Sequence, residues 1–178
     1  MADNNYITPI KFPKFNLELP KNSVKRIAYT DPFSILYALG VPQCKRFDLQ
    51  CLEALIIPQD FLEIHKDIDN VGMPAVAWSL LFCPNNNDNC YLEIYEETPE
   101  TKLLTFKSVS NLTLTHLDPK TAKLVDSWNM KDGACTFNAG AYWHTVRNPT
   151  DNYIHMLSFR SKKIESLNIL KKLIEPLV

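Results

Sequence analysis

The sequence predicts a mainly β protein built as an antiparallel sandwich or barrel. Short apolar or alternating segments recur from Phe61 onward, and turn signals such as PNNNDN at residues 84–89 separate them. Helical patterns occur only before residue 60 and after residue 160. At 178 residues the chain is most simply a single domain, long enough to bury a proper core.

Composition and charge indicate which partners and which cellular location to expect. The net charge of −1 carries no electrostatic footprint of a nucleic-acid partner. The N-terminus lacks a signal pattern and no apolar run reaches membrane-spanning length, so we expect a cytoplasmic protein. Five cysteines without close C-x-x-C spacing favour reduced, mostly buried thiols over a disulfide framework or a zinc site.

The first 59 residues are predicted to form an arm followed by short helices. Residues 6–30 alternate between apolar and polar residues and contain three prolines, which favours edge or loop positions. Asp31 and Pro32 are typical of a helix start, and the segment PFSILYAL that follows ends at Gly40. A second short helix is predicted over residues 48–56.

The middle of the chain is predicted to supply the strands. Residues 74–82 are continuously apolar, as in a strand buried on both faces. Residues 90–97 alternate, with Tyr91, Glu93 and Tyr95 on one face of the strand. Further strands are predicted at 102–109, 111–117, 122–128, 134–139, 143–148 and 153–160, and an amphipathic helix is predicted for residues 161–178.

The most informative spacing is the H-x-D pair of His65 and Asp67. In an extended strand the two side chains project from the same face, with Lys66 turned the other way. His144, which lies before a polar turn and thus near a barrel mouth, is a candidate third ligand. Two histidines and one carboxylate on one face form the facial triad of non-haem Fe(II) oxygenases.

Two alternatives stand beside this interpretation. A second H-x-D pair, His116 and Asp118, competes with the first, although Asp118 precedes Pro119 and has the features of a turn residue. Only 28 residues separate Asp118 from His144, which leaves little chain for intervening strands. A histidine on a strand can also be a hydrogen-bonded core residue, which is the alternative for His144.

The order of these segments resembles that of the Fe(II)/2-oxoglutarate-dependent oxygenase superfamily. The resemblance lies in HKD at 65–67, AWSLLFCPNNNDNCYLEIYE at 77–96 and GAYWHTVRNPTDNYIHMLSFR at 140–160. It is strongest to small stand-alone prolyl- and aspartyl-hydroxylase-type members, including versions carried by bacteriophages. It implies a double-stranded β-helix (jelly roll, cupin-like) over about residues 60–160, flanked by short N-terminal helices and a C-terminal helix. His65, Asp67 and His144 match the three iron ligands.

The cosubstrate site departs from the family pattern. The family usually places an arginine or lysine about ten residues after the distal histidine, where this chain has Ile154. Arg160 shares the strand parity of Ile154, whereas Arg147 is predicted to lie in the turn. A guanidinium is suited to binding a carboxylate. Arg160 and Ser158, with Tyr91 from the alternating strand, are therefore the predicted cosubstrate-binding residues.

The resemblance implies an enzyme that uses Fe(II) and 2-oxoglutarate, releases succinate and hydroxylates a C–H bond. A peptidyl side chain, a free amino acid and a nucleobase all remain open as substrates. The predicted partners are therefore a small-molecule cosubstrate and an unidentified substrate, with a protein among the candidates. Two rival functions stand beside it. Ile154 favours a non-catalytic jelly-roll protein that serves in binding or assembly. The other rival is a cupin-like metal enzyme without 2-oxoglutarate, although cupins usually carry more histidines in glycine-rich motifs.

Overall fold

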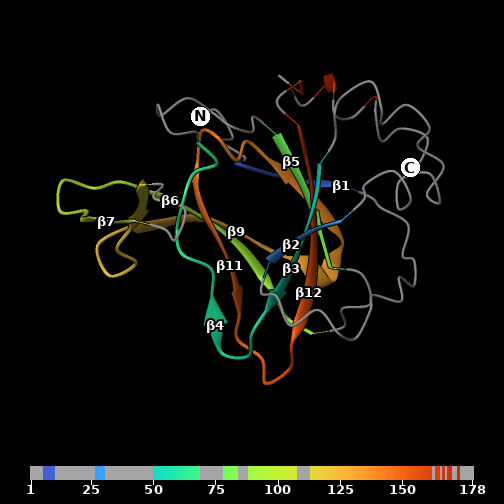
Figure 1. Cartoon of the computed structure of the whole chain (residues 1–178), viewed down its shortest axis with the longest axis horizontal. Helices are drawn as coiled ribbons and strands as arrows, with labels where there is room; N and C mark the ends of the chain where they lie inside the picture. Colours follow the sequence, from blue (N-terminus) through green and yellow to red (C-terminus); the bar gives the residue numbers. More distant parts are fainter. Residues whose placement is uncertain are drawn as a thin grey trace.

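Two antiparallel sheets form the body of the protein in the computed structural model (Figure 1). The structure describes residues 6–10, 27–30, 50–68, 78–83, 88–107 and 113–161, with isolated positions at 163–164, 166, 168–169 and 172. Within this part of the chain every strand pair is antiparallel. The protein is therefore a mainly β, double-stranded β-helix of the jelly-roll or cupin-like kind, which confirms the predicted fold class.

The larger sheet has six strands and contains the longest strand, β12, near its centre. β12 pairs with a strand on either side and has six buried residues among its eight. The strands run in the order β1 (Ile7–Ile10), β10 (Ala134–Phe137), β5 (Trp78–Phe82), β12 (Ile154–Ser161), β3 (Gln50–Ile56) and β2 (Ile27–Thr30).

The smaller sheet has four strands. Its order is β4 (Asp60–Phe61), β11 (Trp143–Asn148), β6 (Tyr91–Glu96) and β9 (Lys123–Asn129). A 3₁₀ turn, η2 (Met130–Asp132), follows β9. One core cluster joins the two sheets: Ala54, Leu81 and Met156 from the larger sheet pack with apolar residues of the smaller one, Leu92, Ile94 and Val146. Alternate residues of β3, β6 and β12 reach this core (Ala54 and Ile56, Leu92 and Ile94, Ile154 and Met156), as the period-2 pattern predicts.

The helix predicted over residues 48–56 is wrong, because residues 50–56 form β3. This segment lies between β12 and β2 and pairs with both. Leu52, Ala54 and Ile56 point to one side at a spacing of two, and Ala54 and Ile56 are almost fully buried. A short apolar run is compatible with either a helix or a strand. Here pairing with β12 on one side and β2 on the other favours the strand.

Other predicted elements fall wholly or partly outside the described residues. This holds for the helix at 32–39 and for residues 74–77 of the predicted strand. It also holds for most of residues 161–178, so the C-terminal helix stays a prediction. Among the described residues, no helix is long and apolar enough to cross a membrane.

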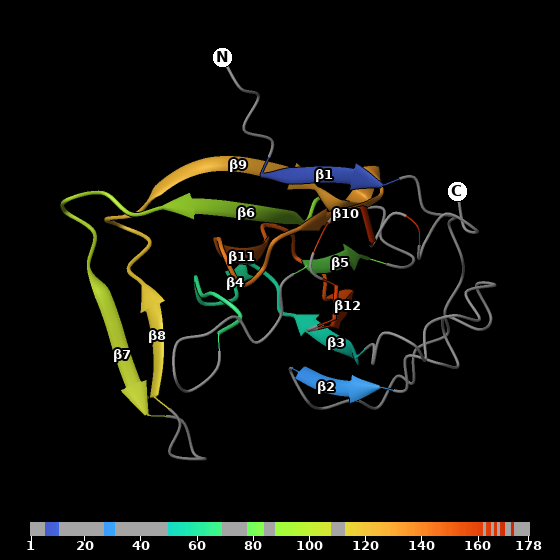
Figure 2. The same ribbon diagram turned by 90° about the horizontal axis from the view of Figure 1, so that it is seen from above.

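A third, two-stranded element projects from the body (Figure 2). It is the hairpin of β7 (Leu103–Lys107) and β8 (Thr113–Leu117). Its base is attached where Leu117 N donates to Ile64 O at 3.0 Å. Ile64 belongs to the segment Leu62–Ile68, which we call the bridging segment because it also pairs with β11 on its other side. The bridging segment therefore lies between β8 and β11.

Candidate metal centre

His65 and His144 lie directly opposite each other on paired backbones. His65 N donates to His144 O at 3.0 Å, and His144 N donates to His65 O at 2.9 Å. Residues opposed in this way carry their side chains on the same face. The centroids of the two imidazole rings are accordingly 4.4 Å apart. Strand pairing thus brings together two histidines that are 79 positions apart in the sequence.

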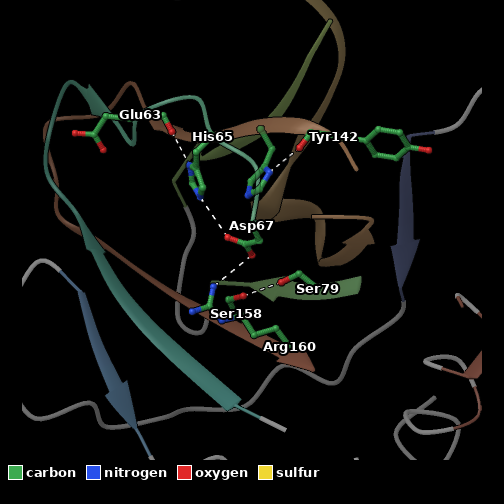
Figure 3. A network of polar contacts seen from close by, with 8 residues as sticks. Glu63, His65, Asp67, Ser79, Tyr142, Ser158 and Arg160 are labelled. Atoms are coloured by element: carbon green, nitrogen blue, oxygen red, sulfur yellow. Dashed lines mark hydrogen bonds and ion pairs between the residues drawn. The ribbon is translucent and has the colours of Figure 1, made fainter. Parts of the chain in front are cut away.

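Asp67 joins the two histidines from the same segment. Its backbone N donates to Ala139 O at 2.9 Å, which keeps the chain extended beyond His65. Asp67 Oδ1 lies 3.6 Å from His65 Nε2 (Figure 3). One ligand atom from each of His65, Asp67 and His144 lies within 4.8 Å of the others. The structure therefore brings the three predicted ligands together around one point.

Both imidazole rings are oriented so that Nε2 is left to bind a metal. His65 Nδ1 lies 2.7 Å from Glu63 O, and His144 Nδ1 lies 3.0 Å from Tyr142 O. A carbonyl oxygen can only accept, so each Nδ1 carries the hydrogen and each Nε2 presents its lone pair. Backbone carbonyls hold metal-binding histidines in this tautomer in many proteins. The donor set therefore fits a first-row divalent ion.

Burial keeps His144 neutral. Its side chain is 6% exposed, and burial, reinforced by the neighbouring His65, lowers its pKa to about 4. A neutral imidazole is the form that coordinates a metal. His144 is thus a competent ligand at neutral pH without losing a proton first.

A cavity of about 70 Å³ opens beside the cluster, between the two sheets. Most of its walls are apolar, and its polar side chains belong to six residues. It is lined by Leu52, Ala54, Leu62, His65, Asp67, Ser79, Leu81, Phe137, His144, Val146, Met156, Ser158 and Arg160.

Arg160 and Ser158 lie in this cavity. Arg160 Nη1 donates to Asp67 Oδ2 at 3.3 Å, on the opposite side of the carboxylate from His65 (Figure 3). Ser158 Oγ is 2.7 Å from Ser79 Oγ. The cation predicted from strand parity therefore lies inside the barrel, next to a candidate metal ligand.

Tyr91 is not brought to the cavity. It lies on the outer face of β6, where the guanidinium of Arg147 packs 4.8 Å from its ring centroid. Arg147 also donates through Nε to Glu93 Oε1 at 2.7 Å. The prediction that Arg147 lies in a turn is wrong, because it is part of β11. The alternation of residues 90–97 already separated Tyr91 from the core residues Leu92 and Ile94, and this signal could have excluded it.

The rival pair does not assemble at the site. The ring centroids of His116 and His65 are 6.4 Å apart, so His116 is a neighbour of the cluster. Asp118 instead accepts from Lys120 N at 3.0 Å, the turn role that its position before Pro119 predicts. The group of potential ligands found among the described residues contains neither of the two.

Ser79 is a polar cavity residue that the sequence did not predict. It lies inside the continuous apolar run of residues 74–82, and a single hydroxyl there was the available signal. Its side chain is 2% exposed. A lone polar residue in a buried strand needs a partner, and that partner is visible only in the folded chain.

Fold and site together define a double-stranded β-helix protein with a His-Asp-His cluster suited to a divalent metal. No protein-family model and no curated protein matches the chain. Similar solved structures include a prolyl-4-hydroxylase from Pseudomonas putida, 15% identical over 77% of this chain and 71% of that one, with a TM-score of 0.42.

Two further structures extend the comparison. An oxidoreductase of the 2OG-Fe(II) oxygenase family from Burkholderia pseudomallei is 12% identical over 71% of this chain and 54% of that one, with a TM-score of 0.38. The oxalate decarboxylase of Bacillus subtilis, which has Mn(II) centres, is 9% identical over 77% of this chain, also with a TM-score of 0.38. The chain spans about a quarter of the length of that decarboxylase, 26%. At such low scores and identities, the fold assignment rests on the strand pairing above.

Proposed function

We propose that the protein is an Fe(II)- and 2-oxoglutarate-dependent oxygenase. The observation that carries the proposal is the convergence of His65, Asp67 and His144, with both Nδ1 atoms bound to carbonyls. Two histidines and a carboxylate leave coordination positions for a cosubstrate and dioxygen. When bound, Fe(II) supplies oxidation of a C–H bond coupled to decarboxylation of the 2-oxo acid. The substrate class stays open among a peptidyl side chain, an amino acid and a nucleobase.

Charge within the cavity supports a dicarboxylate as cosubstrate. Asp67 contributes one negative charge, whereas Arg160 and a divalent ion contribute one and two positive charges. The net of two positive charges is costly in a largely apolar cavity. A dianion such as 2-oxoglutarate neutralises it, and a monoanion does so only by half. In this proposal Arg160 and Ser158 hold the distal carboxylate, and the hydrogen bond from Arg160 to Asp67 Oδ2 leaves Oδ1 on the side of His65.

The decisive experiment is metal titration under anaerobic conditions. Purified protein titrated with Fe(II), or with Mn(II) as a redox-stable substitute, is expected to bind one ion. Asp67→Ala removes the only charged donor among the three candidate ligands and is expected to abolish metal binding. Asp118→Ala, which removes the aspartate of the rival pair, serves as the matched control and is expected to bind like the wild type. Equal binding by the wild type and Asp67→Ala would contradict the metal site.

The cosubstrate is tested on the Fe(II)-loaded protein. Calorimetry without oxygen is expected to show heat of binding for millimolar 2-oxoglutarate, followed by succinate release once oxygen is admitted. A metal-loaded protein that gives no heat would contradict the use of 2-oxoglutarate. That outcome would favour a metal enzyme of the cupin-like kind, for which the contact of Arg160 with Asp67 would be a permanent part of the metal site.

A further inference from the structure

The projecting hairpin has one inner and one outer strand. Figure 2 shows β7 as the outer strand and β8 as the strand nearer the body. β8 has a neighbour on each side, because it pairs with β7 and Leu117 N also donates to Ile64 O. Within the described part of the chain, β7 pairs with β8 alone. Since a sheet of two strands is only marginally stable, a further strand beside β7 would stabilise the hairpin.

Two backbone hydrogen bonds at the base of the hairpin show which residues of β7 direct their backbone groups outward. Asp118 N donates to Lys102 O at 2.9 Å, whereas Leu117, directly opposite Leu103, donates to Ile64. Bonded and non-bonded pairs alternate along an antiparallel ladder. Every second residue of β7 therefore directs its N–H and C=O groups away from β8, and these groups form what we call the outer edge of β7. The residues concerned are Leu103, Thr105 and Lys107.

The outer edge of β7 lacks the features that keep edge strands from pairing, which are charges, prolines and bulges within the strand. β9, at an edge of the smaller sheet, contains Lys123 and Asp126 and has an irregular register with β6. β1, at an edge of the larger sheet, contains Pro9. β7 instead keeps an unbroken register with β8, and its residues 103–106, LLTF, carry no charge. Leu103 and Leu104 are 53% and 47% exposed, so this edge is both open and apolar.

We propose that two copies of this chain associate by antiparallel pairing of their β7 strands, with Thr105 opposite the partner's Thr105. The two hairpins then form one continuous sheet of four strands. This register uses the outward backbone groups of all three residues in each copy, and a two-fold axis makes the contact self-complementary. It places Lys107 opposite the partner's Leu103, so no two like charges are directly opposed.

Charge and contact size describe the expected dimer. The net charge of −1 produces little repulsion between two copies, and every copy presents the same edge. The contact is short, because β7 has five residues, so the dimer is expected to be weak and to depend on concentration. The inference involves neither the metal nor the cosubstrate and is independent of the proposed function.

The first test measures the mass of the full chain in solution by light scattering, from about 10 μM to about 1 mM. The wild type is expected to pass from monomer to dimer. Thr105→Pro removes the outward N–H at the centre of the contact and is expected to stay monomeric. Thr115→Pro is the matched control, because Thr115 is directly opposite Thr105 and its N–H points away from β7. It is expected to dimerise like the wild type, and circular dichroism verifies the fold of both variants.

A second test examines the register of the pairing. In Thr105→Cys the two new cysteines would have Cα atoms about 5.5 Å apart, within the range that a disulfide spans. Mild oxidation with diamide is expected to give a disulfide-linked dimer on a non-reducing gel. In Lys107→Cys the two Cα atoms would be about 13 Å apart, too far for a disulfide. The wild type measures the background from the five native cysteines.

The inference is overturned by any of four results. The wild type stays monomeric at the highest concentration, or Thr105→Pro dimerises like the wild type. Thr115→Pro loses the dimer as Thr105→Pro does, which would show that an intact hairpin, rather than the outer edge of β7, is needed. Lys107→Cys cross-links as efficiently as Thr105→Cys, which would contradict the register. None of these results bears on metal binding, so the proposed function is judged separately.

Discussion

Two backbone carbonyls decide which nitrogen each histidine of the cluster presents. Glu63 O and Tyr142 O accept from the Nδ1 atoms, and each carbonyl lies two residues before its histidine. The tautomer is therefore set by local backbone rather than by distant side chains. Asp67 differs, because its two oxygens are divided between His65 and Arg160. At the residue scale, the site is oriented before any metal arrives.

Asn148 offers a test of how the adjacent turn is held. It is fully buried, and its Nδ2 donates to three backbone carbonyls while its Oδ1 accepts from Thr150 N and Oγ1. Asn148→Ala leaves these buried groups without partners and is expected to lower the free energy of unfolding by about 2–4 kcal/mol. Urea denaturation measures the change. Asn152→Ala removes an exposed contact to Asp88 and is expected to change stability by less than about 0.5 kcal/mol.

At the scale of elements, the bridging segment Leu62–Ile68 is the part that builds the site. Leu62 N and His65 N donate to β11, and Ile64 O accepts from β8. Backbone bonding on both sides fixes the alternation, so that His65 and Asp67 face the cavity and Ile64 faces the other way. Ile64 then packs with Leu117 and Trp143 in a small apolar cluster. The hairpin β7–β8 thereby supports the cluster of candidate ligands from outside.

The attachment of the hairpin is tested by Leu117→Ala. Leu117 is 1% exposed, and a buried leucine truncated to alanine typically loses about 2–5 kcal/mol. We expect faster amide hydrogen exchange in β7, β8 and the bridging segment, because the cluster with Ile64 joins them. Leu103→Ala is the matched control, since Leu103 is directly opposite Leu117 across the hairpin but is 53% exposed. Protection that is unchanged in Leu117→Ala would contradict this role.

At the scale of the whole molecule, the site is shared between the two sheets. His144 comes from the smaller sheet, Arg160 and Ser158 come from the larger one, and the bridging segment supplies the other two candidate ligands. A metal and a dicarboxylate bound between the sheets would cross-connect them. Their binding should therefore be visible in the global stability of the fold.

Metal addition is expected to raise the melting temperature. An ion at about 100 times its dissociation constant stabilises the native state by about 2.7 kcal/mol, which corresponds to roughly 5–10 °C for a chain of this size. Differential scanning fluorimetry with Mn(II) measures the shift, and a chelator is expected to reverse it. Asp118→Ala should show the full shift and Asp67→Ala none. A shift of equal size in Asp67→Ala would place the ion elsewhere.

The sequence by itself determined the local features of this protein. Alternation and turn signals predicted the strands between residues 90 and 160, and H-x-D spacing predicted that His65 and Asp67 share a face. These features depend on neighbours within a few residues, and the extended backbone imposes a period of two on any strand. The turn role of Asp118 before Pro119 is local for the same reason.

Only the tertiary structure decided which distant residues meet. Residues 50–56 became a strand because β2 and β12 pair with them, and Arg147 turned outward because its strand places His144 inward. The partner of Ser79 and the contact of Arg160 with Asp67 likewise depend on register between strands far apart in the chain. Strand register is set by the packing of the whole core, because a shift of one residue would turn every side chain of a strand to the opposite face of the sheet. A local sequence pattern carries no information about this register.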